Sequence, residues 1–251
     1  MGTTPSGYGE PVVSDPADTV RVARPLMCQS WRDITFLHWP YPAEVVQALL
    51  PAGLTVEECD GSAWVGLLPF LMDGVRAPGV PALPWLSRFP ETNVRTYVRG
   101  PDGRTGIWFF SLDAARLPAV LAGRVGYGLP YVWSRMSVQA DGAIRAYRSH
   151  RHRDPAAHCA VTVHIGAALT VPEQTPLDRY LTARHRLYSV VAGRLVTAEA
   201  EHPPWPLRRA RVTELSQTLL EAAGLPSPTG EPVAHASTGV RVRIGRWHRA
   251  R

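Results

Sequence analysis

Short segments with alternating apolar and polar residues make up most of the chain. The clearest hairpin is predicted over 98–113, where two apolar runs flank Pro101-Asp102-Gly103, and a second is predicted over 129–150, turning at Asp141-Gly142. Helices are predicted only over short segments, at 42–53, 117–128 and 216–225 and at the beginning of 176–188. This pattern predicts a mainly β (α+β) protein, a largely antiparallel barrel or sandwich with a few short helices.

The segment FPETNVRTYV at 89–98 has an unusual alternation. In a strand its side chains point to opposite faces by turns, so one face carries Glu91, Asn93, Arg95 and Tyr97. Two neighbouring strands repeat the pattern, each with one shared face: Phe109, Ser111 and Asp113 in one, and Tyr131, Trp133 and Arg135 in the other.

Two interpretations of this polar row stay open. Antiparallel sheets commonly expose one wet face, and periodicity by itself favours that interpretation. The aromatic side chains in these rows are typical of a ligand cavity instead. Inside a cavity, burial would raise the pKa of Glu91 and the nearby Arg95 would lower it, a conflict that is typical of acid/base sites.

Composition limits the class of protein. We expect an extended or disordered leader at 1–25 and a single domain at 26–251, without the run of ~18 apolar residues of a membrane helix or a secretory signal. The odd number of widely spaced cysteines indicates neither a disulfide framework nor a metal pair, and predicts a cytoplasmic location. The oligomeric state, including a homo-oligomer, stays open.

Arginine supplies all 27 basic side chains, and the sequence contains no lysine. A lysine Schiff base is therefore excluded. The net charge is +6, and the basic residues cluster most densely at 145–154. This segment contains one aromatic residue and no nucleic-acid recognition motif, so we expect no nucleic-acid partner. Metal ligation at His150, His152 and His158 stays open, although hairpin ends explain these side chains as well, and no metal or other cofactor is expected.

Several stretches together resemble the YqjF-like family of uncharacterised bacterial proteins, over about residues 28–247. They are QSWRDITFLHWP, DGSAWVGLLPFLMDGVR, FPETNVRTYVR, GIWFFSLDA, GLPYVWSRMSV, YRSHR and HPPWPL, in this order. That family is similar, more distantly, to the acetoacetate decarboxylase superfamily. The resemblance implies a cone-like, mostly antiparallel β-barrel with a central cavity, and it places Glu91 where those decarboxylases have an active-site glutamate.

The resemblance does not extend to the catalytic lysines. The segment 117–132 resembles the one that holds the catalytic lysine pair of those decarboxylases, but here it reads Gly123-Arg124-Val125-Gly126-Tyr127-Gly128. Decarboxylation through an imine therefore does not carry over to this chain.

The sequence thus predicts a cavity that binds a carbonyl-containing organic acid or a polyketide-like compound. Glu91, Arg95 and Tyr97 are the candidate catalytic residues; the candidate substrate-binding residues are Asn93, Ser111, Asp113, Tyr127, Tyr131 and Arg135. Glu91 would act as general acid/base, and Arg95, with Arg135, would hold a carboxylate or enolate oxygen. Such a protein would be a lyase, cyclase or dehydratase that works without a Schiff base. Two alternatives are a non-catalytic binding or sensing protein with the same cavity, and an interaction module that uses the arginine-rich surface.

Overall fold

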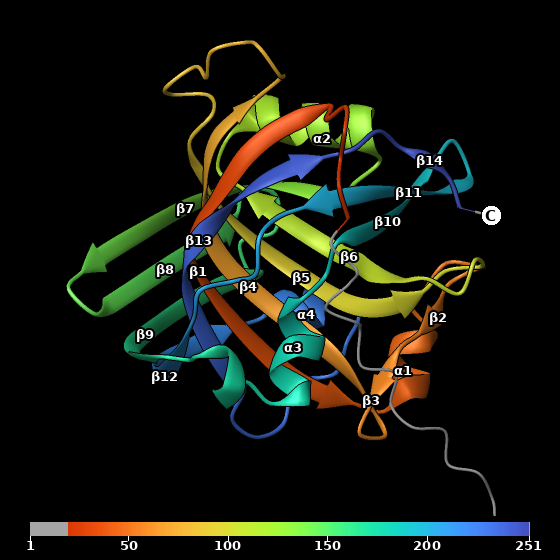
Figure 1. Ribbon diagram of the computed structural model, residues 1–251. Helices are drawn as coiled ribbons and strands as arrows, with labels where there is room; N and C mark the ends of the chain where they lie inside the picture. Colours follow the sequence, from red (N-terminus) through yellow and green to blue (C-terminus); the bar gives the residue numbers. More distant parts are fainter. Residues whose placement is uncertain (1–19, 251) are drawn as a thin grey trace, which may run out of the picture.

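A single sheet of fourteen strands organises the protein, and it curls on itself until its strands form closed rings (Figure 1). The computed structural model describes residues 20–250, so most of the predicted leader at 1–25 lies outside the described residues. Within the part of that leader that is described, Val22 is buried and its backbone N–H donates to Glu201 Oε2 at 2.7 Å.

The mainly β architecture predicted from the sequence is confirmed. The strands are β1 Met27–Tyr41, β2 Thr55–Val56, β3 Glu58–Cys59, β4 Ser62–Arg76, β5 Phe89–Arg99, β6 Thr105–Ala114, β7 Tyr131–Asp141, β8 Ile144–Arg151, β9 His158–Ala168, β10 Arg186–Val191, β11 Arg194–Glu201, β12 Leu207–Gln217, β13 Val233–Ile244 and β14 His248–Arg249. The helices are α1 Ala43–Gln47, α2 Leu117–Tyr127, the 3₁₀ turn Val171–Glu173, α3 Pro176–Thr182 and α4 Leu219–Ala222. None of the helices within residues 20–250 is long and apolar enough to cross a membrane.

Both predicted hairpins form, at β5–β6 and at β7–β8, because their turns are encoded locally. β13 begins at Val233 and is broken by no turn, although Gly239 adopts a φ of 118° within it.

Two rings of strands share one wall. Neighbouring strands pair in the order β6–β7–β8–β9–β12–β13–β1–β4–β5, and pairing of β5 with β6 closes this first ring. A second ring runs from β6 through β10 and β11 to β13, and then returns through the same β1, β4 and β5. All strand pairings are antiparallel except β6–β7 and β6–β10, which are parallel.

The shared wall is buried on both faces because each ring has its own core. One apolar cluster, which includes Phe70, Phe109 and Leu187, fills the side toward β10 and α2. The other, which includes Val94, Tyr147 and Val161, fills the side toward β8 and β9. Both faces of β4 and β5 therefore lie inside the molecule, as the burial of nearly every residue in these strands shows.

Candidate functional site

The polar row of β5 lies inside the barrel. Glu91 exposes 2% of its surface and Asn93 exposes 7%, while Arg95 and Tyr97 are also buried. The interpretation of this face as a wet outer surface is therefore wrong. The burial has a topological cause, since β5 stands in the wall that the two rings share.

The row divides into two environments, and Glu91 and Asn93 face a cavity of about 130 Å³. The cavity lies between the shared wall and α2, and its lining is mostly apolar. Its lining residues are Met27, Gln29, Trp31, Met72, Val75, Phe89, Glu91, Asn93, Phe109, Leu112, Ala119, Ala122, Gly123, Tyr127, Leu129, Tyr131, Leu187 and Ile244. Four of the nine candidate residues thus meet here: Glu91, Asn93, Tyr127 and Tyr131.

Burial dominates the electrostatics of Glu91 and raises the pKa of its carboxyl to about 8. Hydrogen bonds with Tyr131 and Asn93 lower this pKa, and the charge of Asp113 raises it further. The Tyr131 hydroxyl donates to Glu91 Oε2 at 3.2 Å. Burial also raises the pKa of Tyr131 well above its ordinary value, so the phenol stays a neutral donor. The carboxyl is therefore mostly protonated near neutral pH, with a minor ionised fraction.

A glycine of α2 makes room for the Tyr131 ring. A Cβ placed on Gly123 would overlap ring carbons of Tyr131, so any larger residue at 123 would displace the ring or the helix. α2 begins with Pro118 in its first turn and ends at Gly128, which adopts a left-handed φ of 60°. Its inner face, from Ala119 to Tyr127, is thereby held against the cavity.

Two polar atoms of the cavity lining have no hydrogen-bond partner among the described residues. They are Asn93 Oδ1, an acceptor, and Trp31 Nε1, a donor, and both atoms are buried. The Trp31 ring is fixed by stacking on Trp205 at 5.9 Å between ring centroids. Buried polar groups are nearly always paired, so these two atoms are exceptions within the cavity wall, and neither atom is exposed on the cavity surface.

Arg95 and Tyr97 do not line this cavity, because they bond to the end of α3. Arg95 Nη2 donates to the Leu181 carbonyl at 3.2 Å, and the Tyr97 hydroxyl donates to the same oxygen at 2.6 Å. Tyr97 also lies 2.7 Å from His38 Nε2. Burial, with the charge of Arg95 as a secondary cause, lowers the pKa of His38 well below its usual range, so this imidazole is neutral.

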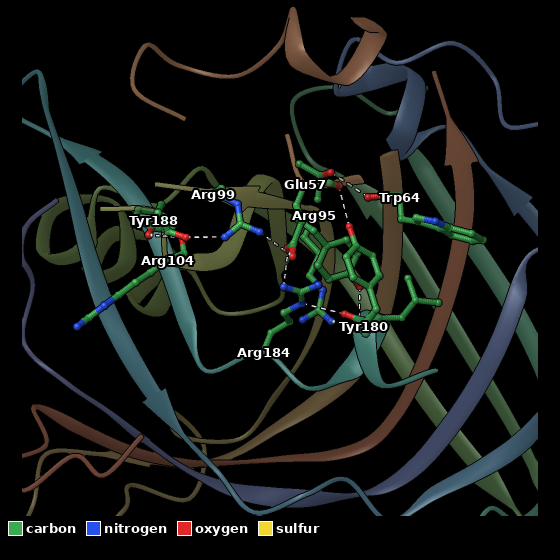
Figure 2. Close-up of polar contacts among 12 residues, drawn as sticks. Glu57, Trp64, Arg95, Arg99, Arg104, Tyr180, Arg184 and Tyr188 are labelled. Atoms are coloured by element: carbon green, nitrogen blue, oxygen red, sulfur yellow. Dashed lines mark hydrogen bonds and ion pairs between the residues drawn. The ribbon is translucent and has the colours of Figure 1, made fainter. Parts of the chain in front are cut away.

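A buried ion pair that the sequence did not reveal lies beside these residues (Figure 2). Arg184 donates to Glu57 Oε2 at 2.6 Å and to the Tyr180 carbonyl at 2.8 Å. Its guanidinium packs against the rings of Tyr97 and Tyr180, 4.7 Å and 4.4 Å from their centroids. The pair could not be found from spacing, because Glu57 and Arg184 lie 127 positions apart.

Ser111 and Asp113 point away from the cavity because β6 contains a bulge. Val94 pairs with Ser111, but Arg95 pairs with Phe109, so Phe110 is an extra residue that reverses the alternation. The expectation that Phe109 shares a face with Ser111 and Asp113 is therefore wrong. Asp113 is fully buried on the other face and is held by Arg151 at 2.9 Å and by Ser134 at 2.9 Å.

Arg135 also lies away from the cavity. It pairs with His150 on β7–β8, beyond the part of β7 that reaches the interior, and its side chain is exposed. His150 and His158 stack at 5.7 Å on the same outer surface. Throughout residues 20–250, no three His, Cys, Asp or Glu side chains are grouped so that they could hold a metal ion.

Comparison with known proteins identifies the family of this chain. The model of DUF2071, described as an uncharacterized conserved protein, matches residues 28–241. The chain belongs to the DUF2071 family. The uncharacterized protein YqjF of Bacillus subtilis (strain 168) is 37% identical over 211 residues, which cover 84% of this chain and 86% of YqjF.

Solved structures that resemble this DUF2071 protein establish the cone-like barrel of the acetoacetate decarboxylase type. Acetoacetate decarboxylase from Legionella pneumophila has a TM-score of 0.65 at 12% identity, covering 98% of this chain and 99% of that one. An acetoacetate decarboxylase-like enzyme from Sphingomonas wittichii RW1 has a TM-score of 0.63 at 15% identity, covering 97% and 100%. The enduracididine biosynthesis enzyme MppR, complexed with pyruvate, has a TM-score of 0.63 at 14% identity, covering 98% of each chain. At these identities the likeness shows the fold alone.

Proposed function

We propose that this DUF2071 protein is a small-molecule enzyme in which Glu91 moves a proton to or from a carbonyl compound in the cavity. One observation carries the proposal: a buried carboxyl with a pKa of about 8 faces a mostly apolar cavity. A group with such a pKa is present in both protonation states near neutral pH, as a general acid/base requires. The three cysteines of the protein are free thiols, which supports the cytoplasmic location expected from the sequence.

In the proposed step the ionised Glu91 carboxylate takes a proton from the carbon next to the substrate carbonyl. The electron pair of that C–H bond moves onto the carbonyl oxygen, and an enolate forms. If protonated Glu91 then gives the proton to a leaving hydroxyl group, water is released in a dehydration. If the enolate carbon instead attacks a second carbonyl of the same molecule, a C–C bond forms, the new alkoxide takes the proton back from Glu91, and the result is a cyclisation.

The other parts of the site fit this chemistry without an amine. The chain has no lysine, so its residues cannot form a lysine imine with a carbonyl substrate. Tyr131 bonds to Glu91 and holds the carboxyl in place, while Asn93 lies beside it on the same strand. MppR is a protein of similar fold that binds pyruvate, which supports a small carbonyl compound as the occupant here.

Proton exchange tests the proposal without knowledge of the natural substrate. The protein is incubated in D₂O with methyl pyruvate, pyruvamide and pyruvate, and deuterium entering the methyl group is followed by NMR. We expect catalysed exchange that rises with pH and levels off above about pH 8, as the carboxylate form fills. Glu91→Gln should lower the rate by ~10²-fold or more, since it cannot accept the proton.

The matched control is Glu44→Gln, which removes an exposed carboxylate on α1 and should leave the exchange rate unchanged. Equal exchange rates for the wild type and Glu91→Gln would overturn the catalytic role of Glu91.

The second candidate is a protein that binds its ligand without changing it. The mostly apolar lining favours this alternative, because it suits retention of a neutral compound as well as turnover. Such a protein would catalyse no deuterium exchange into any of the three probes. Glu91→Gln would not change its affinity for an uncharged probe.

A further inference from the structure

We infer that the cavity selects uncharged ketones that carry an alkyl group over keto acids of the same shape. The inference rests on the proposed function and narrows its substrate class. Of the two classes that the sequence predicts, it sets aside the carbonyl-containing organic acid and keeps an uncharged compound.

The strands supply the cavity with a firmly packed apolar surface. Five of its lining residues come from five different strands, β4, β5, β6, β10 and β13, and belong to one core cluster. They are Met72, Phe89, Phe109, Leu187 and Ile244, and none is more than 8% exposed. Core side chains are held by close packing, and apolar surface is more stable against an alkyl group than against water. This surface therefore favours an apolar part on the ligand.

The side of α2 that faces the cavity carries small residues. Ala119 and Ala122 line the cavity. Three larger apolar residues of the helix, Leu117, Leu121 and Val125, are instead 40%, 52% and 85% exposed. Surface helices usually turn their large apolar residues toward the core. Here the alanines leave room between the helix and the strands, and a ligand alkyl group can fill it.

The charges around the cavity disfavour an anion. The lining residues of the described cavity include no Arg, Lys or His. Arg95, which the sequence assigns to a carboxylate, instead donates to the Leu181 carbonyl at the end of α3. The charge of Asp113 raises the pKa of Glu91, so this carboxyl already lies in the field of another anion. A substrate carboxylate beside Glu91 would be buried without a cationic partner, which is strongly unfavourable.

A matched pair of ligands tests the effect of charge. Methyl isopropyl ketone and pyruvate have the same number and branching of non-hydrogen atoms, and they differ in that an isopropyl group replaces the carboxylate. Dissociation constants are measured by NMR titration of the backbone amide signals, near neutral pH and at one ionic strength. We expect the ketone to bind ~10-fold or more tightly than pyruvate.

A series of methyl ketones tests the effect of the alkyl group. From methyl ethyl ketone to methyl pentyl ketone, the affinity should rise ~4-fold for each added methylene while the cavity has room, and then level off. The cavity of about 130 Å³ is close to the size that admits one benzene molecule, so we expect the affinity to level off within this series.

Two substitutions on α2 assign the effect to the cavity. Ala119→Leu fills part of the space between the helix and the strands, so the affinity should level off at a shorter ketone. Val125→Leu enlarges a side chain on the exposed face of the same helix. It is the control and should leave every affinity unchanged.

The wild-type ranking decides the inference even if Ala119→Leu fails to fold. Pyruvate binding as tightly as methyl isopropyl ketone, no gain in affinity along the series, or failure of every ketone to bind at its limit of solubility would each overturn it. The predicted ranking without deuterium exchange would uphold the selectivity and refute the proposed catalysis. Exchange into pyruvate that depends on Glu91, together with the reversed ranking, would uphold the proposed function and refute the selectivity.

Discussion

Glu91 is a carboxylic acid whose protonation is set by where the chain places it. Its hydrogen bonds with Tyr131 and Asn93 favour the charged form, yet burial outweighs them and the pKa rises. Because burial is the main cause, the shift depends on the closed wall of the barrel more than on any one neighbour. A carboxyl of this kind also links the stability of the fold to pH.

We expect the stability of the protein to fall as pH rises toward about 8, and Glu91→Gln to remove this dependence. The pKa of Glu91 is about 8 in the folded protein and 4.5 for the same carboxyl without the protein environment, so protonation of Glu91 favours folding. This contribution is complete below about pH 4.5 and is lost as pH rises through about 8. At about 1.4 kcal/mol for each pKa unit, the loss is on the order of 5 kcal/mol.

Urea unfolding of both proteins across this pH range measures the effect. Glu44→Gln, the exposed control, should follow the wild type. Parallel pH profiles for the wild type and Glu91→Gln would show that Glu91 titrates normally.

At the scale of elements, the short helix α3 is held by donors from other parts of the chain. Its final carbonyls accept from Arg184, from Arg95 and Tyr97 together, and from Trp205 Nε1 at 3.1 Å. Cationic donors at a helix C-terminus satisfy the free carbonyls and oppose the helix dipole. Half of the polar row of β5 therefore anchors a helix, and only the other half faces the cavity.

Arg184→Met should destabilise the protein by ~3–5 kcal/mol, because it leaves the buried Glu57 carboxylate without its 2.6 Å partner. The matched control is Arg99→Met. Arg99 lies 3.8 Å from the same carboxylate, but 40% of its side chain is exposed, so its loss should cost ~1 kcal/mol or less. Chemical denaturation measures both values. Equal values for the two variants would contradict the assignment of Arg184 as the main partner of Glu57.

On the scale of the whole molecule, β6 is a strand at which the two rings diverge. It pairs with β5, β7 and β10, and the bulge at Phe110 lets its two halves serve different cores. The β7–β8 hairpin contrasts with it, since most residues of β7 beyond Ser134 are exposed or half-buried. The cavity therefore lies against the most deeply buried part of the sheet.

Hydrogen exchange should follow this arrangement. We expect the amides of β4, β5 and the inner part of β6 to exchange slowest, and those of the β7–β8 hairpin near Asp141 to exchange fastest among the long strands. Exchange measured by mass spectrometry on peptides of each strand tests the ranking. Faster exchange in β5 than in β7 would contradict a common, doubly buried wall.

How far the sequence predicts this structure depends on the range of the interactions involved. The hairpins, α2 and the polar row of β5 follow from local spacing and turn residues, and were predictable. Burial of Glu91 was one of two interpretations, because alternation alone does not tell an inner face from an outer one.

Long-range features left no usable pattern in the sequence. The bulge at Phe110 reversed the facing of Ser111 and Asp113 without any glycine or proline to indicate it. Arg95 looked like a substrate clamp because its partner, a backbone carbonyl of α3, is 86 positions away. The pairing of Glu57 with Arg184 was missed for the same reason.

The close contact of Gly123 with the Tyr131 ring constrains how this cavity can change over evolution. A lysine at 123 would need the volume that the Tyr131 ring already occupies, so it would displace that ring or α2. A smaller residue at 131 would make room for the lysine, but the protein would then lose the phenol beside Glu91. An amine side chain at 123 and the present pair of Tyr131 and Glu91 therefore compete for the same volume of the barrel.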